Sequence, residues 1–180
     1  MCARYEMNAN AREVMARFGL NIPPPLPNRA EVRPTDTALV LAPDGPRIMR
    51  WGLDVTWSRQ PLINARQDTL TSKPTFRRLL GNPVLIPATS WWEWLKDGKA
   101  RLKHRLRPAG LELFAFAGLA EGERFTMVTT EACPTAAPVH DRMPLVLAAE
   151  AEAAWLAGAL LSPFTGEVTV EREEGQKELF

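Results

Sequence analysis

The sequence predicts an α+β fold: one domain whose core is a twisted, partly closed antiparallel β-sheet, with a few short helices outside it. Short strand-like runs are separated by turn sequences such as KDGK, RPAG and AEGE, which is the spacing of an antiparallel meander. The 16 prolines favour short strands and extended connectors over long helices. A length of 180 residues fits a single domain. We therefore expect one domain over residues 1–180, with a mobile tail at about 171–180.

Three short helices are expected outside the sheet. They are predicted at residues 11–18, 73–80 and 149–161. Asn10 and Ser72 are the expected N-caps of the first two, and Gly19 and Gly81 their ends. The third is amphipathic and stops before Pro163.

Nine segments have the composition of strands. They are residues 37–42, 47–53, 84–88, 91–95, 99–106, 112–119, 124–130, 144–148 and 167–173. The first two flank APDGP, a turn with Asp-Gly at its centre, and so predict a hairpin. The segment NIPPPLPN at residues 21–28 cannot be helical and is expected to be an extended surface connector.

Composition and charge exclude several classes of protein. The net charge is +1, so a nucleic-acid partner requires basic side chains gathered on one face. Two cysteines, Cys2 and Cys133, form no disulfide framework and suit a reducing cytosol. The polar N-terminus lacks a signal-peptide core, and the longest apolar tract contains Glu150 and Glu152. We expect a cytoplasmic monomer with no membrane segment, no metal site and no cofactor.

Cys2 follows the initiator methionine directly. Removal of Met1 would leave an α-amine and a thiol on one residue. Such a 1,2-aminothiol can close a five-membered thiazolidine ring on an aldehyde, which an internal cysteine cannot do. The alternative is an incidental thiol at a frayed terminus.

The segment PLINARQDTL is polar where a core strand would not be. Asn64, Arg66 and Asp68 occupy alternating positions and would share one face of an extended segment. Together they would offer an amide, a guanidinium and a carboxylate. The alternative is a capped turn that leads into the next helix.

Glu93 lies between tryptophans in WWEWL. A carboxylate in apolar surroundings has a raised pKa, which suits general acid–base catalysis. The alternative is an exposed glutamate on an edge strand, with the tryptophans packed inward.

His140 is one of two histidines and stands beside Asp141 and Arg142 in APVHDRMPLVL. It is a candidate acid–base group, although a lone histidine is often structural. The other histidine, His104, lies in the basic run RLKHRLR and is expected to be solvated.

Five ordered motifs together resemble one known family. They are MCxRY at the start, WGL (51–53), PLINAR (61–66), PATSWWEW (87–94) and APVHDRMPLVL (137–147). The chain resembles the SRAP family, whose name stands for SOS response-associated peptidase and whose members are also called abasic-site processing proteins. The resemblance runs from Met1 to about Trp155. It implies a mostly antiparallel α+β domain with a positively charged groove.

The resemblance implies a role in the DNA damage response, with a lyase-like activity on abasic single-stranded DNA. Members cross-link the abasic sugar to the cysteine exposed by methionine removal, as a thiazolidine. Cys2 would be the nucleophile, Asn64 would position the sugar, and Glu93 and His140 would transfer protons. The residues expected to contact DNA are Arg4, Arg66, Lys73, Arg77, Thr129 and Arg142. Trp51 or Trp57 would stack on a base, with core packing as the alternative for each.

The chain departs from the family pattern at Ala3, at Asp68, at the Trp-Trp pair before Glu93, and at Lys73, which only approximately matches a basic position of the family. Ala3 stands where glycine is usual, and it would be strained if a positive φ were required there. Asp68 stands where the family usually has glutamate. Two other functions stay open: a thiol peptidase that uses Cys2 and His140 on its own N-terminus, and a non-catalytic module for single-stranded DNA.

Overall fold

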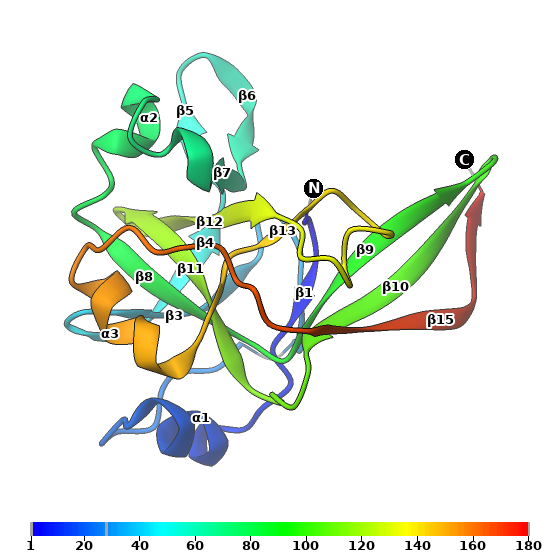
Figure 1. Cartoon of the computed structure of the whole chain (residues 1–180). Helices are drawn as coiled ribbons and strands as arrows, with labels where there is room; N and C mark the ends of the chain where they lie inside the picture. Colours follow the sequence, from blue (N-terminus) through cyan, green and yellow to red (C-terminus); the bar gives the residue numbers. More distant parts are fainter. Residues whose placement is uncertain (1, 28, 180) are drawn as a thin grey trace.

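The structure of the protein, a computed structural model, describes residues 2–27 and 29–179, the last six of these for the backbone alone. Figure 1 shows two β-sheets side by side, with short helices around the larger one. A two-stranded hairpin, β5 (Leu53–Val55) and β6 (Ser58–Leu62), stands at the edge of the larger sheet. The α+β class predicted from the sequence is confirmed.

The larger sheet closes on itself. Its strands are β3 (Thr37–Ala42), β4 (Gly45–Trp51), β7 (Asn64–Arg66), β8 (Pro83–Ala88), β11 (Phe114–Glu121), β12 (Arg124–Glu131), β13 (Arg142–Pro144) and β14 (Val146–Leu147). Pairing runs from β12 through β4, β3, β8 and β11, and β11 pairs with β12 again. The expected partial closure is therefore present. The sheet is mixed, because β4 and β7 each pair with β12 in parallel.

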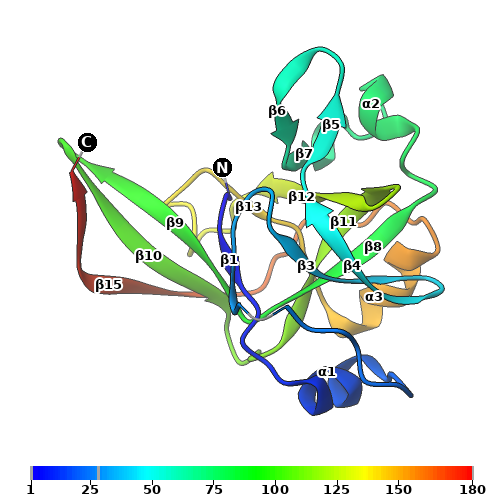
Figure 2. The same ribbon diagram turned by 180° about the vertical axis from the view of Figure 1, so that it is seen from behind.

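The smaller sheet forms an arm. Its strands are β15 (Val168–Leu179), β10 (Ala100–Pro108), β9 (Ser90–Asp97), β1 (Tyr5–Glu6) and β2 (Glu31–Val32), in that order across the sheet. Strands β9, β10 and β15 extend away from the larger sheet, as Figures 1 and 2 show from opposite sides. The β15 backbone continues to Leu179, past the expected end of that strand at residue 173.

Helix α1 (Ala11–Phe18) matches the predicted helix at both ends. The Asn10 side chain accepts a hydrogen bond from the Glu13 amide at 3.0 Å, and the Glu13 carboxylate accepts one from the Asn10 amide at 2.7 Å. This is a capping box. Gly19 has a φ of 65°, the left-handed conformation that ends a helix.

The other two helices are shorter than predicted. Helix α2 (Pro74–Arg77) follows a 3₁₀ turn at Gln67–Thr69 and begins after Lys73. Ser72 is not its cap, because the Ser72 hydroxyl donates to the Thr69 carbonyl instead. Helix α3 (Ala149–Leu156) stops five residues before the expected end at 161, since Gly158 has a φ of 89°.

The predicted continuous meander is wrong. Strands β8 and β11 are neighbours in the larger sheet, whereas the β9–β10 hairpin between them in sequence belongs to the arm. The chain leaves the larger sheet after Ala88 because β9 pairs instead with β1, where Trp91 lies opposite Tyr5. The strand expected at 144–148 is also divided, into β13 and β14, at Leu145.

The aromatic core lies where the two sheets meet. Tyr5 packs edge-on against Trp51 and Phe116, with ring centroids 5.3 and 6.0 Å apart, and Trp91 packs on Phe114 and Phe116. Cys2 belongs to this cluster and is 1% exposed. The N-terminal segment is therefore anchored to the core from Cys2 onward, and the frayed-terminus alternative is wrong.

In the part of the chain that the structure describes, none of the helices is long and apolar enough to cross a membrane.

Candidate functional site

Strand β1 brings Cys2 beside strand β9. The Arg4 carbonyl accepts a hydrogen bond from the Trp92 amide at 3.0 Å and another from the Cys2 thiol, with Sγ 3.7 Å away. Burial raises the pKa of the Cys2 thiol well above its usual value, and the nearby Glu93 carboxylate raises it further. The resting thiol is therefore protonated at neutral pH.

Asn64 holds the backbone of Cys2 from the other side. Parallel pairing of β7 with β12 sets Asn64 opposite Met127. The Asn64 side-chain amide donates to the Cys2 carbonyl at 2.8 Å. Its Oδ1 is buried and accepts no hydrogen bond from any described residue. That oxygen is an available acceptor for a bound molecule.

Glu93 is 3% exposed, so the alternative of an exposed edge glutamate is wrong. Burial raises the pKa of Glu93 to about 7, and the Asp141 carboxylate contributes in the same direction. A carboxyl group with this pKa can both donate and accept a proton at neutral pH.

His140 lies in the loop before β13. Its Nδ1 is 3.0 Å from the Arg142 amide nitrogen and 3.0 Å from Oδ1 of Asp141. Burial lowers the pKa of His140, which favours the neutral ring. Nδ1 also lies 3.2 Å from the Arg142 carbonyl oxygen, so it accepts from the Arg142 N–H in one neutral tautomer and donates to a neighbouring oxygen in the other.

Two pockets meet at His140. The β7 pocket, of about 450 Å³, and the β9 pocket, of about 420 Å³, share this side chain. The β7 pocket is lined by Trp57, Leu62, Asn64, Arg66, Lys73, Thr75, Phe76, Thr129, His140, Asp141 and Arg142. The β9 pocket is lined by Ala3, Arg4, Glu93, Trp94, Lys96, Arg101 and His140. Ala3, next to Cys2, opens on the β9 pocket, and Asn64, which binds Cys2, opens on the β7 pocket.

Each pocket carries three cationic side chains. Arg66, Lys73 and Arg142 line the β7 pocket, and Arg4, Lys96 and Arg101 line the β9 pocket. The net charge of the chain is only +1, so this cluster is a local concentration of positive charge. Such a concentration is typical of a surface for a polyanion.

The structure gathers most of the predicted DNA contacts in these pockets. Arg4, Arg66, Lys73, Thr129 and Arg142 line them, whereas Arg77 is exposed on α2 and lines neither. Sequence reasoning missed Lys96, Arg101 and Trp94. The guanidinium of Arg4 lies 4.8 Å from the Trp94 ring centroid. Trp94 and Lys96 alternate along β9, but their place in the pocket depends on Arg4 and His140, which are distant in sequence.

Two tryptophans considered for base stacking have different environments. Trp51 is fully buried, as the core-packing alternative expected, and its indole N–H donates to the Ile63 carbonyl at 2.8 Å. Trp57 lies in the turn between β5 and β6 and is 67% exposed on the rim of the β7 pocket. The core-packing alternative is wrong for Trp57.

The arginines of the β7 pocket are held differently. Arg142 is 12% exposed, and its Nη2 donates to the Thr129 carbonyl at 2.8 Å. Arg66 is 58% exposed and donates to both oxygens of Asp68, at 3.2 and 2.8 Å. The alternative considered for PLINARQDTL, a capped turn before the next helix, is right for its last part only. Gln67–Thr69 form a 3₁₀ turn directly after β7.

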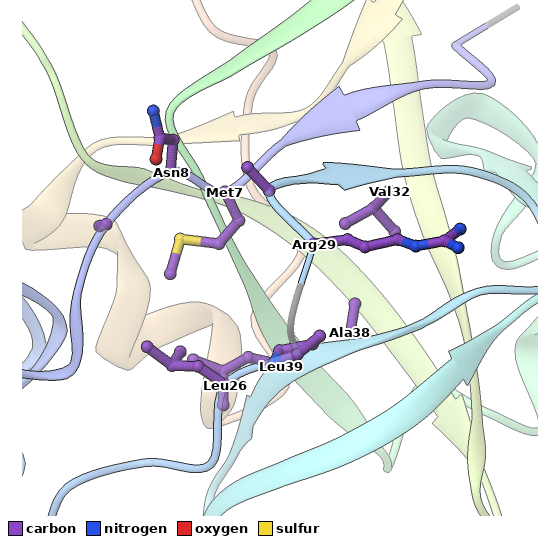
Figure 3. A pocket seen from close by; sticks show the side chains of 10 residues that line it. Met7, Asn8, Leu26, Arg29, Val32, Ala38 and Leu39 are labelled. Atoms are coloured by element: carbon purple, nitrogen blue, oxygen red, sulfur yellow. The ribbon is translucent and has the colours of Figure 1, made fainter.

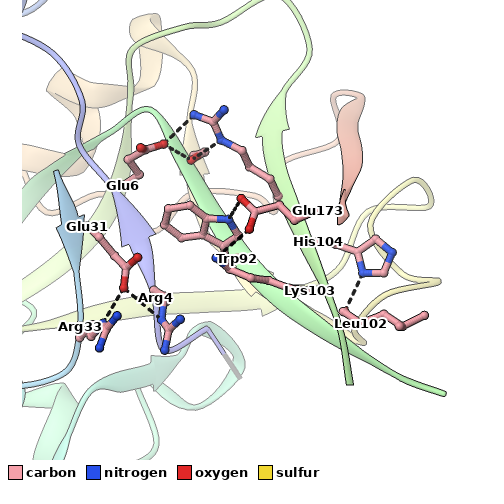
Figure 4. Close-up of polar contacts among 11 residues, drawn as sticks. Arg4, Glu6, Glu31, Arg33, Trp92, Leu102, Lys103, His104 and Glu173 are labelled. Carbon is pink, nitrogen blue, oxygen red and sulfur yellow. Dashed lines mark hydrogen bonds and ion pairs between the residues drawn. The ribbon is translucent and has the colours of Figure 1, made fainter. Parts of the chain in front are cut away.

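His104 is 8% exposed, so the expectation that it is solvated is wrong. Strand β10 is covered on both edges, and His104 lies opposite Glu93 of β9 and Arg172 of β15. Its Nδ1 lies 2.9 Å from the Leu102 carbonyl (Figure 4).

Ala3 does not have the strained backbone that a positive φ would impose. Thr35 is the only described non-glycine residue with a positive φ.

A paired polar cluster, here called the outer network, lies on β9, β10 and β15 (Figure 4). The Glu173 carboxylate accepts from the Trp92 indole N–H at 3.0 Å and pairs with Lys103 at 2.8 Å. The Lys103 ammonium lies 4.5 Å from the Trp92 ring centroid. Nearby, Arg105 pairs with Glu6 at 2.6 Å.

A third pocket, of about 310 Å³, is separate from this site. Met7, Leu26, Val32 and Leu39 form its apolar wall, and Arg29 lies along its rim (Figure 3). It shares no lining residue with the β7 or β9 pocket.

No group of three or more metal-ligating side chains occurs among the described residues. Around Cys2 the structure gathers its thiol, the Asn64 amide, the Glu93 carboxyl and the His140 imidazole.

Comparison with known proteins identifies the family. The family model described as SOS response associated peptidase (SRAP) matches residues 1–171. The chain belongs to the SRAP family. The expectation drawn from the five sequence motifs is confirmed.

Curated relatives of this SRAP chain include proteins of two bacteria. The abasic site processing protein YoaM of Bacillus subtilis is 32% identical, over 91% of this chain and 82% of its own length. The abasic site processing protein YedK of Escherichia coli is 27% identical, over 87% and 79%. A crystal structure of a Bacteroides thetaiotaomicron protein has a TM-score of 0.82 at 24% identity and covers 95% of this chain and 91% of its own. This likeness shows that the SRAP fold is shared.

Proposed function

We propose that this protein binds single-stranded DNA at an abasic site and links the abasic sugar to Cys2 as a thiazolidine, once Met1 has been removed. Relatives at 32% and 27% identity are named abasic site processing proteins, which supports abasic DNA as the substrate. The observation that carries the proposal is the 2.8 Å hydrogen bond from Asn64 to the Cys2 carbonyl, at the junction of two cationic pockets.

The reaction begins at the amine. The ring-closed sugar opens to its aldehyde, and the α-amine of Cys2 attacks the aldehyde carbon to give a carbinolamine. Loss of water gives an imine. The thiol then adds to the same carbon, its proton passes to the imine nitrogen, and the thiazolidine is complete. Overall, one aldehyde and one aminothiol combine, and one water molecule is released.

The pKa values support this order of steps. An α-amine has an ordinary pKa of about 7.7–8.0, so a usable fraction is neutral at pH 7. The thiol pKa is raised by burial, so few thiolates are present to attack first. Closure by the thiol is intramolecular and gains from the high effective concentration of a group on the same residue.

Glu93 and His140 divide the proton transfers. Glu93, with a pKa of about 7, can protonate the sugar ring oxygen as the ring opens and the hydroxyl that leaves as water. His140, whose neutral form is favoured by burial, can exchange a proton with the incoming oxygen. The available Oδ1 of Asn64 can accept a hydrogen bond from the sugar or the amine.

Binding to the strand would come from the six pocket cations and the exposed ring of Trp57. Arginine and lysine contacts to phosphates weaken as salt rises. Stacking of a base on an exposed tryptophan is worth about 1–3 kcal/mol. Cations in both pockets would hold the strand on either side of Cys2.

The test is a denaturing gel. The protein is mixed with a single-stranded oligonucleotide that bears one abasic site, and a covalent band is expected that disappears in Cys2→Ala. Cys133→Ala is the matched control, because Cys133 is also buried but contacts Thr135 and lines neither pocket. Intact mass should give the sum of both partners less one water.

Two further variants distinguish the thiazolidine from a simpler link. A glycine inserted before Cys2 keeps the thiol but moves the amine, and should abolish the stable band. Cys2→Ser keeps the amine and should give a band only after borohydride reduction of the imine. A stable band with the inserted glycine would contradict the proposal.

The same reagents test the two other functions. A thiol peptidase would release peptides from casein and lose this activity in Cys2→Ala. The described contacts give it little support, because the Cys2 thiol donates to the Arg4 carbonyl and has a raised pKa. A non-catalytic module would bind the oligonucleotide in a salt-sensitive way and give no band that survives denaturation.

A further inference from the structure

Asp68 lies between the two arginines of the β7 pocket. Arg66 donates to its Oδ1 and Oδ2 at 3.2 and 2.8 Å, and Nη2 of Arg142 lies 3.5 Å from Oδ1. The hydrogen bond from Arg66 lowers the pKa of Asp68, so the carboxylate is charged at neutral pH. A carboxylate that bridges two guanidinium groups presents acceptor oxygens much as a phosphate would.

We propose that Asp68 is a specificity-determining residue that occupies, in the free protein, the position between Arg66 and Arg142 that a DNA phosphate would take. An intact single strand must then displace Asp68 to reach both arginines. The inference rests on the proposed function only in taking single-stranded DNA as the ligand.

The exposure of the Arg66–Asp68 ion pair indicates that Asp68 competes with a phosphate rather than holding the arginines in position. Arg66 and Asp68 are 58% and 52% exposed, and ion pairs so exposed impose little order on their side chains. Arg142 is already held by the Thr129 carbonyl, so it does not need Asp68 for its orientation. The negative charge of Asp68, in contrast, stays beside any phosphate that enters and opposes it.

Competition of this kind lowers the occupancy of the groove by intact strands. An intact strand binds only reversibly, so the full effect of Asp68 falls on its occupancy of the groove. An abasic strand is captured by a covalent bond, so a weaker initial encounter is completed by chemistry. Asp68 thus keeps the groove free of the intact strands that outnumber lesions.

The test measures reversible binding of an intact, unmodified single-stranded oligonucleotide in a Cys2→Ala background. With Asp68→Asn we expect binding about fivefold tighter at low salt, which corresponds to removal of one nearby like charge. The slope of log affinity against log salt should become steeper by about 0.7, the value for one more phosphate contact on a single strand. Asp68→Ala should change both quantities in the same direction.

The matched control is Asp44→Asn. Asp44 is also exposed and paired with an arginine, Arg47, but it lies in the β3–β4 turn and lines neither site pocket. Asp44→Asn changes the net charge by the same amount as Asp68→Asn. The affinity of the Asp44→Asn variant for the oligonucleotide should stay within about 1.5-fold of the parent. Asp68→Glu, which keeps the charge, should restore the parent affinity.

Three results would overturn the inference. Weaker binding by Asp68→Asn would mean that Asp68 positions the arginines, unchanged binding would mean that it does not compete, and an effect equal to that of Asp44→Asn would mean that only net charge counts. Thermal unfolding of each variant verifies that it is folded. Failure of the proposed cross-link would appear separately, as a missing gel band in the parent protein with abasic DNA.

Discussion

The outer network and the Cys2 site both include residues of strand β9. They differ in whether their buried polar groups have hydrogen-bond partners within the chain. In the outer network, Trp92 and Lys103 each find a partner in Glu173. In the Cys2 site, the buried Oδ1 of Asn64 accepts no hydrogen bond from the described residues, the buried Nε of Arg142 donates none to them, and Glu93 has a pKa of about 7.

Adjacent residues of a strand point to opposite faces, so Trp92 and Glu93 belong to different environments although they are neighbours in sequence. Polar groups that stabilise a fold have their hydrogen bonds completed within the chain. Groups that act on a ligand keep capacity for it. Under the proposed function, the unused hydrogen-bonding capacity around Cys2 is available to the ligand.

The largest expected effect comes from Glu93→Gln. The amide cannot transfer the proton, so the rate of the proposed cross-link should fall by about 10²- to 10⁴-fold, measured by single-turnover gel assay. Affinity for intact single-stranded DNA should change less than about twofold. Glu112→Gln, at an exposed position outside both pockets, is the control. An equal loss of rate and affinity would remove Glu93 from proton transfer.

The second effect is on stability and its pH dependence. The folded state raises the pKa of Glu93 from 4.5 to about 7, so it binds the proton more tightly than the unfolded chain. The Glu93 contribution to the free energy of unfolding is therefore present below about pH 4.5 and is lost as pH rises through 7, by up to about 3 kcal/mol.

Glu93→Gln should consequently be more stable than the parent by about 3 kcal/mol at pH 8, and this difference should fall to about 1 kcal/mol at pH 5. Urea unfolding at the two pH values measures the difference. If the difference in free energy of unfolding between variant and parent were the same at both pH values, the pKa of Glu93 would not be raised in the folded protein.

The third effect is the loss of stability when the outer network is disrupted. Lys103→Met removes the cation that pairs with Glu173, and should lower the free energy of unfolding by about 1–2 kcal/mol. This is less than for a fully buried pair, because Glu173 is 35% exposed. The cross-linking rate of the folded variant should not change. A large loss of rate in folded protein would show that the two regions are coupled.

The smallest effect concerns Asp141. Its carboxylate raises the pKa values of both Glu93 and His140, so Asp141→Asn should lower both. The pH–rate profile should move slightly to lower pH, with a change of about twofold in rate at pH 7, because Asp141 is 89% exposed and well screened. A shift to higher pH would contradict the assigned sign.

Local signals in the sequence were sufficient for some elements. Asn10 and Gly19 set both ends of α1, and the Asp-Gly turn placed the β3–β4 hairpin. Cys2, Asn64, Glu93 and His140 are the catalytic candidates that the sequence predicts, and the structure places them around one junction.

The remaining features depend on long-range pairing, which no local pattern encodes. His104 is buried because β15, more than sixty residues later, covers β10. The meander failed because β9 pairs with β1 rather than with β8. Lys96 and Arg101 were missed because their relevance depends on Arg4, which reaches them only in the folded sheet.

The Cys2 carbonyl is held by a strand near residue 64, and the neighbouring loop is not complete until residue 142. A ribosome adds about 5–20 residues per second, so the first reactive residue of this protein waits roughly 7–30 s for the last part of its enclosure to be synthesised. Under the proposed function, an aminothiol exposed by early removal of Met1 would be open to small aldehydes during that interval. Rapid translation, or delayed trimming of the initiator residue, would protect the newborn chain from being consumed before it meets DNA.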